Sequence, residues 1–263
     1  MNILYIGDVM GEMGLAAVEK VLPQLKKDRA VDVVIAQAEN VTNGRGLSLV
    51  DAERLRNLGV DAMSGGNWST HLPETKQLLD DVNYPATAPA NMPEAGPGYK
   101  YVPSPAGPVL LISLLGQIVG RDADKAVENP LKVIDKILAD EPAHKRVATV
   151  VNFHGDFSSE KFIIGYYLDG RASVVVGDHW HVPTADADVL PKGTAHMTDV
   201  GMCGSLDSSL GVVFESVLPR WRDGVQTRNV LETTGRNQFN ALLVTVDETT
   251  GKATSAEHIR QVW

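Results

Sequence analysis

The chain opens with Asn2-Ile3-Leu4-Tyr5-Ile6-Gly7-Asp8, a short apolar run that stops at a glycine and a carboxylate. Such a run predicts a buried strand followed by a turn. Two more runs of this kind follow, and helical patterns separate them. The sequence predicts strands at residues 2–6, 32–38 and 61–64, and helices at residues 11–27, 48–58 and 73 to about 80. This alternating order implies a parallel sheet whose loops gather at one edge.

The second half of the chain predicts another group of strands. A loop rich in proline and glycine covers residues 84–98. After it, the pattern predicts strands at 109–115, 147–153 and 172–177 and helices at 129–138 and 158–168. Three β runs at 228–232, 241–247 and 253–259 predict a C-terminal antiparallel meander. No linker or internal repeat divides the chain, so we expect one compact α/β domain over residues 1–263 that contains two sheets.

The composition argues against several classes of protein. Hydrophobic residues make up 43% of the 263 residues and charged residues 22%, which is typical of a soluble globular enzyme. No apolar run reaches the roughly 18–20 residues that span a bilayer, so no membrane segment is expected. Cys203 is the single cysteine, which excludes an intramolecular disulfide and favours a reducing cytoplasm. The net charge of −9 argues against general nucleic-acid binding but is compatible with a small anionic substrate at a metal site.

Polar side chains that bind metals follow five of the predicted β runs, at the point where each run ends. They are Asp8, Glu39 with Asn40, Asn67, His154, and the pair His179 and His181. In open α/β sheets, ligands bind outside the carboxyl ends of the strands, so these residues are expected to meet at one site. Each residue alone has an ordinary interpretation as a turn former, a helix cap or a packed histidine. The repetition at five strand ends favours a metal site.

The histidine pair and the absence of thiolates narrow the chemistry. His179 and His181 are two residues apart, which in an extended segment places both imidazoles on one face, about 6.5–7 Å apart at the backbone. They can then bind one metal ion or two neighbouring ions. Carboxylate, carboxamide and imidazole ligands without cysteine suit manganese, iron or zinc rather than a structural zinc site. A carboxylate that bridges two ions about 3.5–4 Å apart would create a two-metal site for displacement at phosphorus.

Several motifs together resemble the calcineurin-like metallophosphoesterases, and among them the YmdB-like bacterial phosphodiesterases. The motifs are Gly7-Asp8-Val9, Ala38-Glu39-Asn40, Gly66-Asn67, Pro89-Ala90-Asn91, Phe153-His154, Ser158-Ser159-Glu160-Lys161, Asp169-Gly170-Arg171-Ala172, Gly177-Asp178-His179-Trp180-His181-Val182, Pro183-Thr184-Ala185-Asp186 and Thr198-Asp199-Val200-Gly201-Met202. The resemblance covers nearly the whole chain. It implies a four-layer α/β/β/α sandwich, in which two facing mixed β-sheets are flanked by helices and the metal site lies at the strand ends.

The resemblance also implies the ligands of two metal ions, with iron or manganese expected and zinc as the alternative. Asp8 and His181 would bind one ion, with Asn40 beside it. Glu39 would bridge to a second ion, whose other ligands would be Asn67, His154 and His179. Members of this family hydrolyse phosphodiesters, cyclic nucleotides among them, through a hydroxide that bridges the metals. They tend to form oligomers, so the expected partners are a small phosphodiester or cyclic nucleotide and further copies of the chain in a homo-oligomer.

Trp68 is the main departure from the family pattern. A histidine that gives a proton to the leaving group usually follows the asparagine ligand, whereas Trp68 follows Asn67 here. An indole donates a hydrogen bond but cannot deliver a proton as a general acid. Loss of such a group typically costs about 10²–10⁴ in rate. His71 is our candidate for a replacement acid, with an exposed loop histidine as the alternative interpretation, and Asn40 is the second catalytic candidate.

Other departures concern the substrate. Ala88 and Gln117 stand where arginine is usual, which implies weaker phosphate binding or a different substrate. Trp68 and Trp180 are candidates for stacking on a nucleobase, and packing against their own loops is the alternative. His196 stands where a tyrosine is usual, and it either faces the substrate or packs within a strand.

Two functions follow from these observations. The first is a metal-dependent phosphodiesterase that hydrolyses cyclic nucleotides or similar small phosphodiesters. The second is a catalytically weak, metal-containing protein that binds and senses a nucleotide or another phosphorylated ligand. The complete ligand set favours hydrolysis, whereas Trp68 and the missing arginines favour the sensor. A hydrolase of non-phosphate substrates is a third interpretation.

Overall fold

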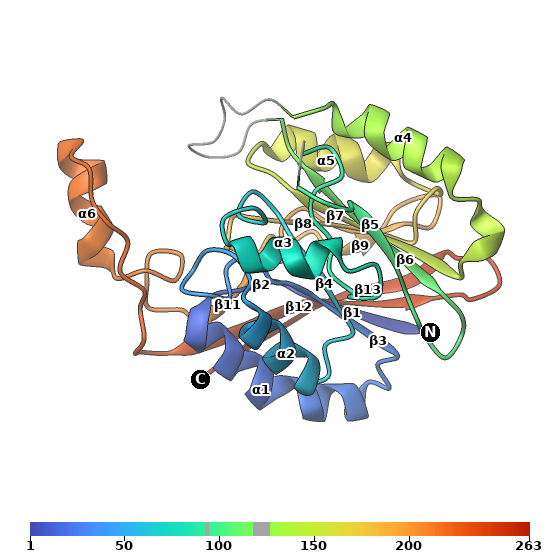
Figure 1. Ribbon diagram of the computed structural model, residues 1–263. Coiled ribbons are helices and arrows are strands. Elements are labelled where there is room, and N and C mark those ends of the chain that lie inside the picture. The colour runs from blue at the N-terminus through green and yellow to red at the C-terminus, as the bar shows by residue number, and fades with distance from the viewer. Residues whose placement is uncertain (93–94, 118–126) are drawn as a thin grey trace.

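Two mixed β-sheets form the centre of the protein, seen in a computed structural model that describes residues 1–92, 95–117 and 127–263 (Figure 1). Within these residues the first sheet has the strand order β2-β11-β12-β1-β3-β4, and β13 also pairs with β12. Its strands are β1 (Asn2–Ile6), β2 (Asp8–Val9), β3 (Val33–Gln37), β4 (Ala62–Ser64), β11 (Met202–Ser205), β12 (Asn237–Val246) and β13 (Ala253–Val262). The sheet is mixed because β1 pairs in parallel with β3 and antiparallel with β12.

The second sheet has the strand order β5-β6-β7-β8-β10-β9 among the described residues. Its strands are β5 (Tyr99–Val102), β6 (Val109–Leu115), β7 (Ala148–His154), β8 (Val174–Asp178), β9 (Asp188–Val189) and β10 (Ala195–Met197). The four inner strands run parallel, and β5 and β9 pair antiparallel at the two edges. The carboxyl ends of β7 and β8 therefore lie side by side, at His154 and Asp178.

Helices cover the outer face of each sheet (Figure 1). The first sheet packs against α1 (Gly11–Asp28), α2 (Leu49–Asn57) and α3 (Pro73–Asp80), and the second against α4 (Pro130–Asp140) and α5 (Ser158–Tyr167). A short 3₁₀ helix covers Ala143–Lys145. A separate buried apolar layer lies between the two sheets. The predicted α/β/β/α arrangement of two facing mixed sheets flanked by helices is confirmed.

The first strand shows why the opening run of the sequence is apolar throughout. Ile3 and Tyr5 belong to the apolar layer between the sheets, whereas Leu4 and Ile6 belong to the layer under the helices. Because both faces of the sheet are covered, a continuous apolar run replaces the polar–apolar alternation of a half-exposed strand. At Gly7 a Cβ atom would lie 2.1 Å from the carbonyl oxygen of Gly201. Only glycine permits this approach, which leads the chain into Asp8.

The predicted C-terminal meander is correct for its last two strands, which pair antiparallel, and wrong for its first at 228–232. β12 enters the first sheet between β11 and β1, and only β13 pairs with it as a hairpin. Residues 228–232 form no strand in the described part of the chain; Leu231 makes an isolated bridge with Val212. The reason is that this segment runs beside a protruding arm rather than beside a sheet edge, and Val230 is 54% exposed there. Its apolar pattern is that of a strand, but no sheet edge is available to pair with it.

That arm carries α6 (Phe214–Asp223), a helix that the sequence did not predict. α6 stands away from the two sheets (Figure 1). Its apolar residues Phe214, Val217, Leu218 and Trp221 recur at helical spacing and would have indicated a helix, although Val217 is the only buried residue of α6. Val217 packs on Met10 in a small separate cluster, while Trp221 is 81% exposed. The expected homo-oligomer stays a prediction.

The proline-rich loop at 84–98 is partly ordered against the first sheet. Residues 93–94 of this loop lie outside the described residues. In the part described, Ala86 forms an isolated bridge with Met63, and the Thr87 backbone N–H donates to the Met63 carbonyl at 2.9 Å. The start of the loop therefore runs beside β4. Across the described residues, no helix combines the length and the apolar character needed to cross a membrane.

Candidate metal centre

Three of the predicted ligands meet at the ends of strands from both sheets. His154 Nε2 lies 3.0 Å from Glu39 Oε1 and 2.9 Å from Asn67 Oδ1. His154 ends β7 of the second sheet, whereas Glu39 and Asn67 follow β3 and β4 of the first. The two sheets thus supply different donors to one point, as the strand-end rule predicts.

Gly66 makes this convergence possible. A Cβ atom at Gly66 would lie 2.5 Å both from Glu39 Oε2 and from ring atoms of His154. The backbone beside Asn67 therefore approaches both ligands more closely than any other residue allows. This close approach explains why glycine directly precedes the asparagine.

His179 completes a group of three ionisable donors. The rings of His154 and His179 lie 4.5 Å apart between centroids, at 67° to each other. One donor atom each from Glu39, His154 and His179 lie within 4.8 Å of one another. This spacing suits a single metal ion bound by two imidazoles and a carboxylate.

Asp8 and His181 form a second pair beside this group. His181 Nε2 lies 3.6 Å from Asp8 Oδ1, and that oxygen is buried without a hydrogen-bond partner. His181 Nδ1 lies 3.1 Å from the Leu210 carbonyl, which accepts only from a protonated nitrogen, so Nδ1 carries the hydrogen and Nε2 is left to act as a ligand. The backbone N–H of His179 donates to Asp8 Oδ2 at 3.3 Å and links the two groups.

Asn40 provides a further oxygen at the same place. Its Nδ2 donates to the Gly44 carbonyl at 2.9 Å, while its Oδ1 is buried and has no hydrogen-bond partner among the described residues. Buried oxygens are rarely left unpaired, because each loses its hydration without compensation. The unpaired oxygens of Asn40 and Asp8 fit the carboxylate and carbonyl ligands that manganese and iron accept. The donor set of this chain therefore fits a metal centre.

Asp178 orients His154 from behind. Its Oδ1 lies 2.7 Å from His154 Nδ1, and its Oδ2 accepts from the Tyr5 hydroxyl at 2.8 Å and from Gln37 Nε2 at 3.3 Å. Asn152 Nδ2 donates to the same oxygen. A carboxylate on the far nitrogen of a histidine ligand fixes both the tautomer and the ring direction. Nε2 of His154 is thus directed at Glu39 and Asn67.

The buried charges of the site compensate one another. Burial alone would lower the pKa of His154, but the carboxylates of Glu39 and Asp178 raise that pKa well above its ordinary value. Burial alone would raise the pKa of Asp8, but His181 lowers it. The pKa of His181 is raised by Asp8, although its burial acts in the opposite direction. Metal binding at these histidines therefore releases protons.

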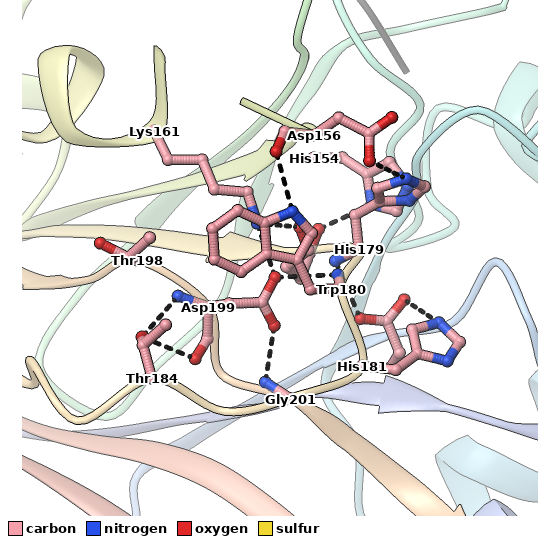
Figure 2. A network of polar contacts seen from close by, with 12 residues as sticks. His154, Asp156, Lys161, His179, Trp180, His181, Thr184, Thr198, Asp199 and Gly201 are labelled. Carbon is pink, nitrogen blue, oxygen red and sulfur yellow. Dashed lines mark hydrogen bonds and ion pairs between the residues drawn. The ribbon is translucent and has the colours of Figure 1, made fainter. Parts of the chain in front are cut away.

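The segment that carries the two histidines is a turn rather than the extended run expected from the sequence. His179 and His181 have φ angles of 99° and 62°, in the left-handed region that side chains disfavour. As a result His179 lies beside His154 (Figure 2), and His181 Nε2 is directed at Asp8. The expectation that both imidazoles share one face is wrong, because it assumed strand geometry. Each such backbone costs on the order of 1–3 kcal/mol and persists only where its surroundings fix it.

A pocket of about 490 Å³ opens over these groups. Its lining residues include Glu39, Asn40, Arg45, Trp68, Asp156, His179, Trp180, His181, Arg220 and Trp221. The backbone N–H of Trp68 donates to Glu39 Oε2 at 2.8 Å, and the Arg45 guanidinium lies 4.6 Å from the centroid of the Trp68 ring. The volume falls within the range of ordinary small-molecule sites.

Two of the predicted catalytic and substrate-binding residues, His71 and His196, lie outside the lining of this pocket, as do the buried predicted ligands Asp8, Asn67 and His154. His71 is exposed and lines a neighbouring cavity. Its ring lies edge-on to the Trp68 ring, with the two centroids 5.3 Å apart. His196 is buried in β10, where Nδ1 lies 2.9 Å from the Val175 carbonyl. Burial lowers the pKa of His196 and favours its neutral form. The position of His196 corresponds to the strand-packing alternative raised from the sequence.

Three charged residues of the pocket were not predicted from the sequence, namely Arg45, Asp156 and Arg220. Asp156 follows the ligand His154 by two positions, and its Oδ1 lies 3.1 Å from His179 Nε2, so the strand-end rule extended by two residues would have found it. Arg45 and Arg220 give no such signal. Arg45 lies in the loop after β3, and Arg220 lies on α6, a helix that was not predicted from the sequence.

Comparisons with known proteins agree with this architecture. A family described as YmdB-like protein matches residues 4–259. The chain is 36% identical over 261 residues to a 2',3'-cyclic-nucleotide 2'-phosphodiesterase of Bacillus subtilis (strain 168), a match that covers 98% of this chain and 96% of that protein. A crystal structure of a phosphatase from Mycoplasma pneumoniae is similar with a TM-score of 0.91 and 30% identity, covering 100% of this chain and 93% of that one.

A more distant structure shares the fold alone. A calcineurin-like phosphoesterase from Bacillus subtilis has a TM-score of 0.56 and 12% identity, and the similarity covers 100% of this chain and 90% of the other. The group of Glu39, His154 and His179 could hold a metal ion. The family match and the Bacillus relative each extend along nearly the whole chain. The chain therefore belongs to the YmdB-like family and is a phosphoesterase with the calcineurin-like fold.

Proposed function

We propose that this protein is a metal-dependent phosphodiesterase that hydrolyses cyclic nucleotides or similar small phosphodiesters. The observation that carries the proposal is the convergence of donor atoms from Glu39, His154 and His179 at the base of a pocket that Glu39 and His179 line. Buried oxygens of Asp8 and Asn40, without a hydrogen-bond partner among the described residues, lie next to this group. The Bacillus relative is named a 2',3'-cyclic-nucleotide 2'-phosphodiesterase, so 2',3'-cyclic nucleotides are the first substrates to test.

The proposed ligands divide into two sets. Asp8 and His181 would hold one ion with Asn40 beside it, Asn67, His154 and His179 would hold the other, and Glu39 would lie between them. Iron or manganese suits these oxygen and nitrogen donors best, with zinc as the alternative. Two ions held here would supply an activated water and neutralise charge on the phosphoryl oxygens. Asp178 would keep His154 in the tautomer that leaves Nε2 unprotonated toward the ion.

The pocket walls suggest how the rest of a substrate is held. Arg45 and Arg220 bring positive charge to the pocket. They are candidates to replace the two arginines that are usual in the family at the positions of Ala88 and Gln117. No carboxylate among the described residues forms an ion pair with Arg45, so the charge of Arg45 is available to an anion. The flat faces of Trp68 and Trp180 would contact a base or sugar.

A second candidate is a catalytically weak sensor of nucleotides or phosphorylated ligands. Trp68 favours it, because this residue lines the pocket and its indole cannot deliver a proton to the leaving oxygen. His71 makes an edge-to-face contact with the Trp68 ring and does not line the pocket, so its role as the replacement acid stays a prediction.

Removal of metal is the first test. Protein purified without added metal is expected to contain about two ions per chain, and chelation is expected to lower turnover of bis(4-nitrophenyl) phosphate by at least about 10³-fold, with recovery on adding manganese. Elemental analysis and the chromogenic assay measure the two effects. Two ions without turnover on this diester or on 2',3'-cyclic nucleotides would favour the sensor, and a protein that takes up no metal would overturn both candidates.

Arg45→Gln tests the pocket wall. Loss of one charge-assisted contact to a phosphate is expected to raise KM for a 2',3'-cyclic nucleotide about tenfold or more, with kcat nearly unchanged if the contact is equal in the ground and transition states. Arg56→Gln is the matched control, because Arg56 also lies over an aromatic ring, that of Tyr84, but does not line the pocket. An unchanged KM for Arg45→Gln would remove Arg45 from the binding site.

A further inference from the structure

A buried ion pair lies next to the segment that carries His179 and His181 (Figure 2). Lys161 Nζ lies 2.6 Å from Asp199 Oδ2, and both side chains are 0% exposed. Lys161 comes from α5, and Asp199 comes from the loop after β10. Neither residue lines the pocket or belongs to the proposed ligand set. The pair therefore has no direct part in the chemistry proposed above.

Each member of the pair also holds a backbone group on one side of His179. Lys161 Nζ donates to the Asp178 carbonyl at 2.6 Å, immediately before His179. Asp199 Oδ2 accepts from the Trp180 backbone N–H at 2.9 Å, immediately after it. The other oxygen, Oδ1, accepts from the Gly201 N–H at 2.9 Å and so fixes the carboxylate itself. The peptide groups flanking His179 are thus tied to one rigid pair, as the dashed lines of Figure 2 show.

The side chain between the two histidines is held as well. Lys161 Nζ lies 4.1 Å from the centroid of the Trp180 ring, within the range of a cation–π contact. Trp180 Nε1 donates to the Asp156 carbonyl at 2.9 Å. Lys161 therefore contacts this segment through both backbone and ring.

Stability alone is a poor explanation for such a pair. Replacing a buried ion pair by apolar groups of similar volume often leaves a protein as stable as before, because desolvation offsets the attraction between the charges. The backbone of residues 178–182, in contrast, must be held by its neighbours, since His179 and His181 both have left-handed φ angles. A backbone in this region relaxes unless its neighbours determine it.

We propose that the Lys161–Asp199 pair is a positioning device that holds the 178–182 segment in its left-handed turn, so that His179 and His181 are directed at two different ligand groups. The consequence for metal binding rests on the ligand assignment proposed above. Without the pair, the segment relaxes toward an ordinary backbone, and its two imidazoles leave the positions that face His154 and Asp8.

The double substitution Lys161→Met with Asp199→Asn tests this role. It removes both charges while nearly conserving volume, so neither charge is left buried and unpaired. The chelated double variant is expected to melt within about 5 °C of the chelated parent. Its dissociation constant for Mn²⁺, measured by calorimetry, is expected to rise about 10–100-fold, the usual effect of losing support behind a metal ligand. This separation of affinity from stability distinguishes positioning from a purely structural role.

Lys100→Met is the matched control. Lys100 is also largely buried and donates to a backbone carbonyl, that of Asp81, but it does not contact the ligand groups. Its Mn²⁺ affinity should equal that of the parent. If the double variant folds and binds Mn²⁺ as tightly as the parent, the positioning role is overturned.

Hydrogen exchange in the parent provides a measurement that needs no variant. In chelated protein the Trp180 amide is expected to exchange as slowly as the amides of β8, because it donates to a buried carboxylate. Exchange at the rate of an exposed loop would overturn the proposal even if the double variant fails to fold. A parent that binds no Mn²⁺ would instead reject the ligand assignment, while slow exchange would still support the restraint on the segment.

Discussion

Glu39→Gln is expected to lower kcat/KM for a phosphodiester by about 10³-fold or more and to reduce the bound metal below two ions per chain. Glu39 Oε1 lies 3.0 Å from His154 Nε2, and its Oε2 accepts from the Trp68 N–H, so both oxygens face the proposed centre. An amide of the same size keeps the shape but loses the negative charge that two cations would share. Elemental analysis and the chromogenic assay, at saturating and at limiting Mn²⁺, measure the two effects.

The control for this substitution is Glu53→Gln, which removes a carboxylate from the exposed side of α2. It should leave metal content and activity unchanged. Melting curves of chelated protein show whether Glu39→Gln is folded. If folded Glu39→Gln retains two ions and full turnover, Glu39 does not lie between the metals, and the division of ligands proposed here has to be redrawn.

Trp68→His is expected to raise kcat by about 10²–10⁴ for a substrate with a poor leaving group, such as a 2',3'-cyclic nucleotide. The position lines the pocket beside Glu39, so an imidazole there could reach the departing oxygen. The gain should be much smaller for bis(4-nitrophenyl) phosphate, because nitrophenolate leaves without a proton. Comparing kcat for the two substrates in parent and variant separates proton donation from a general change in the pocket.

Trp221→His is the matched control, since Trp221 lines the same pocket from the exposed side of α6. It adds a histidine to the pocket without placing it beside Glu39. An inert parent that becomes active through Trp68→His would identify the natural protein as a sensor. A parent that already turns over the cyclic nucleotide rapidly, and gains nothing from the substitution, would mean that another group supplies the proton. Asp156, 3.1 Å from His179, would then be the first to test.

The sequence carried most of the information about the fold. The strand at 109–115 and the helix starting at Pro73 occur as predicted, and the first strand–helix units agree within one or two residues. These elements are recognisable because their apolar periodicity matches burial on one face of a helix or on both faces of a sheet. The strand predicted at 228–232 does not form, and α6 and the short strands β2, β5, β9, β10 and β11 were not predicted. Short strands of two to four residues carry too little periodicity to be recognised.

The residues of the candidate site were also predicted only in part from the sequence. Strand-end placement alone predicted Glu39, Asn67 and His154 as neighbours, because parallel strands deliver their carboxyl ends to one edge and their register is set by the core. It gave no indication that Asp156 and Arg220 line the same pocket or that His71 does not. Those positions depend on loop and arm conformations, which local propensity does not encode.

By itself, then, the sequence determined the two-sheet architecture and the strand-end residues that meet between the sheets, since both follow from periodic burial. Only the tertiary structure decided where the side chains of the connecting segments point. The left-handed turn at His179 and His181 is the clearest case, because its φ angles are opposed by local sterics and are held by Lys161 and Asp199 from distant parts of the chain. Contacts of that kind exist only once the sheets have packed.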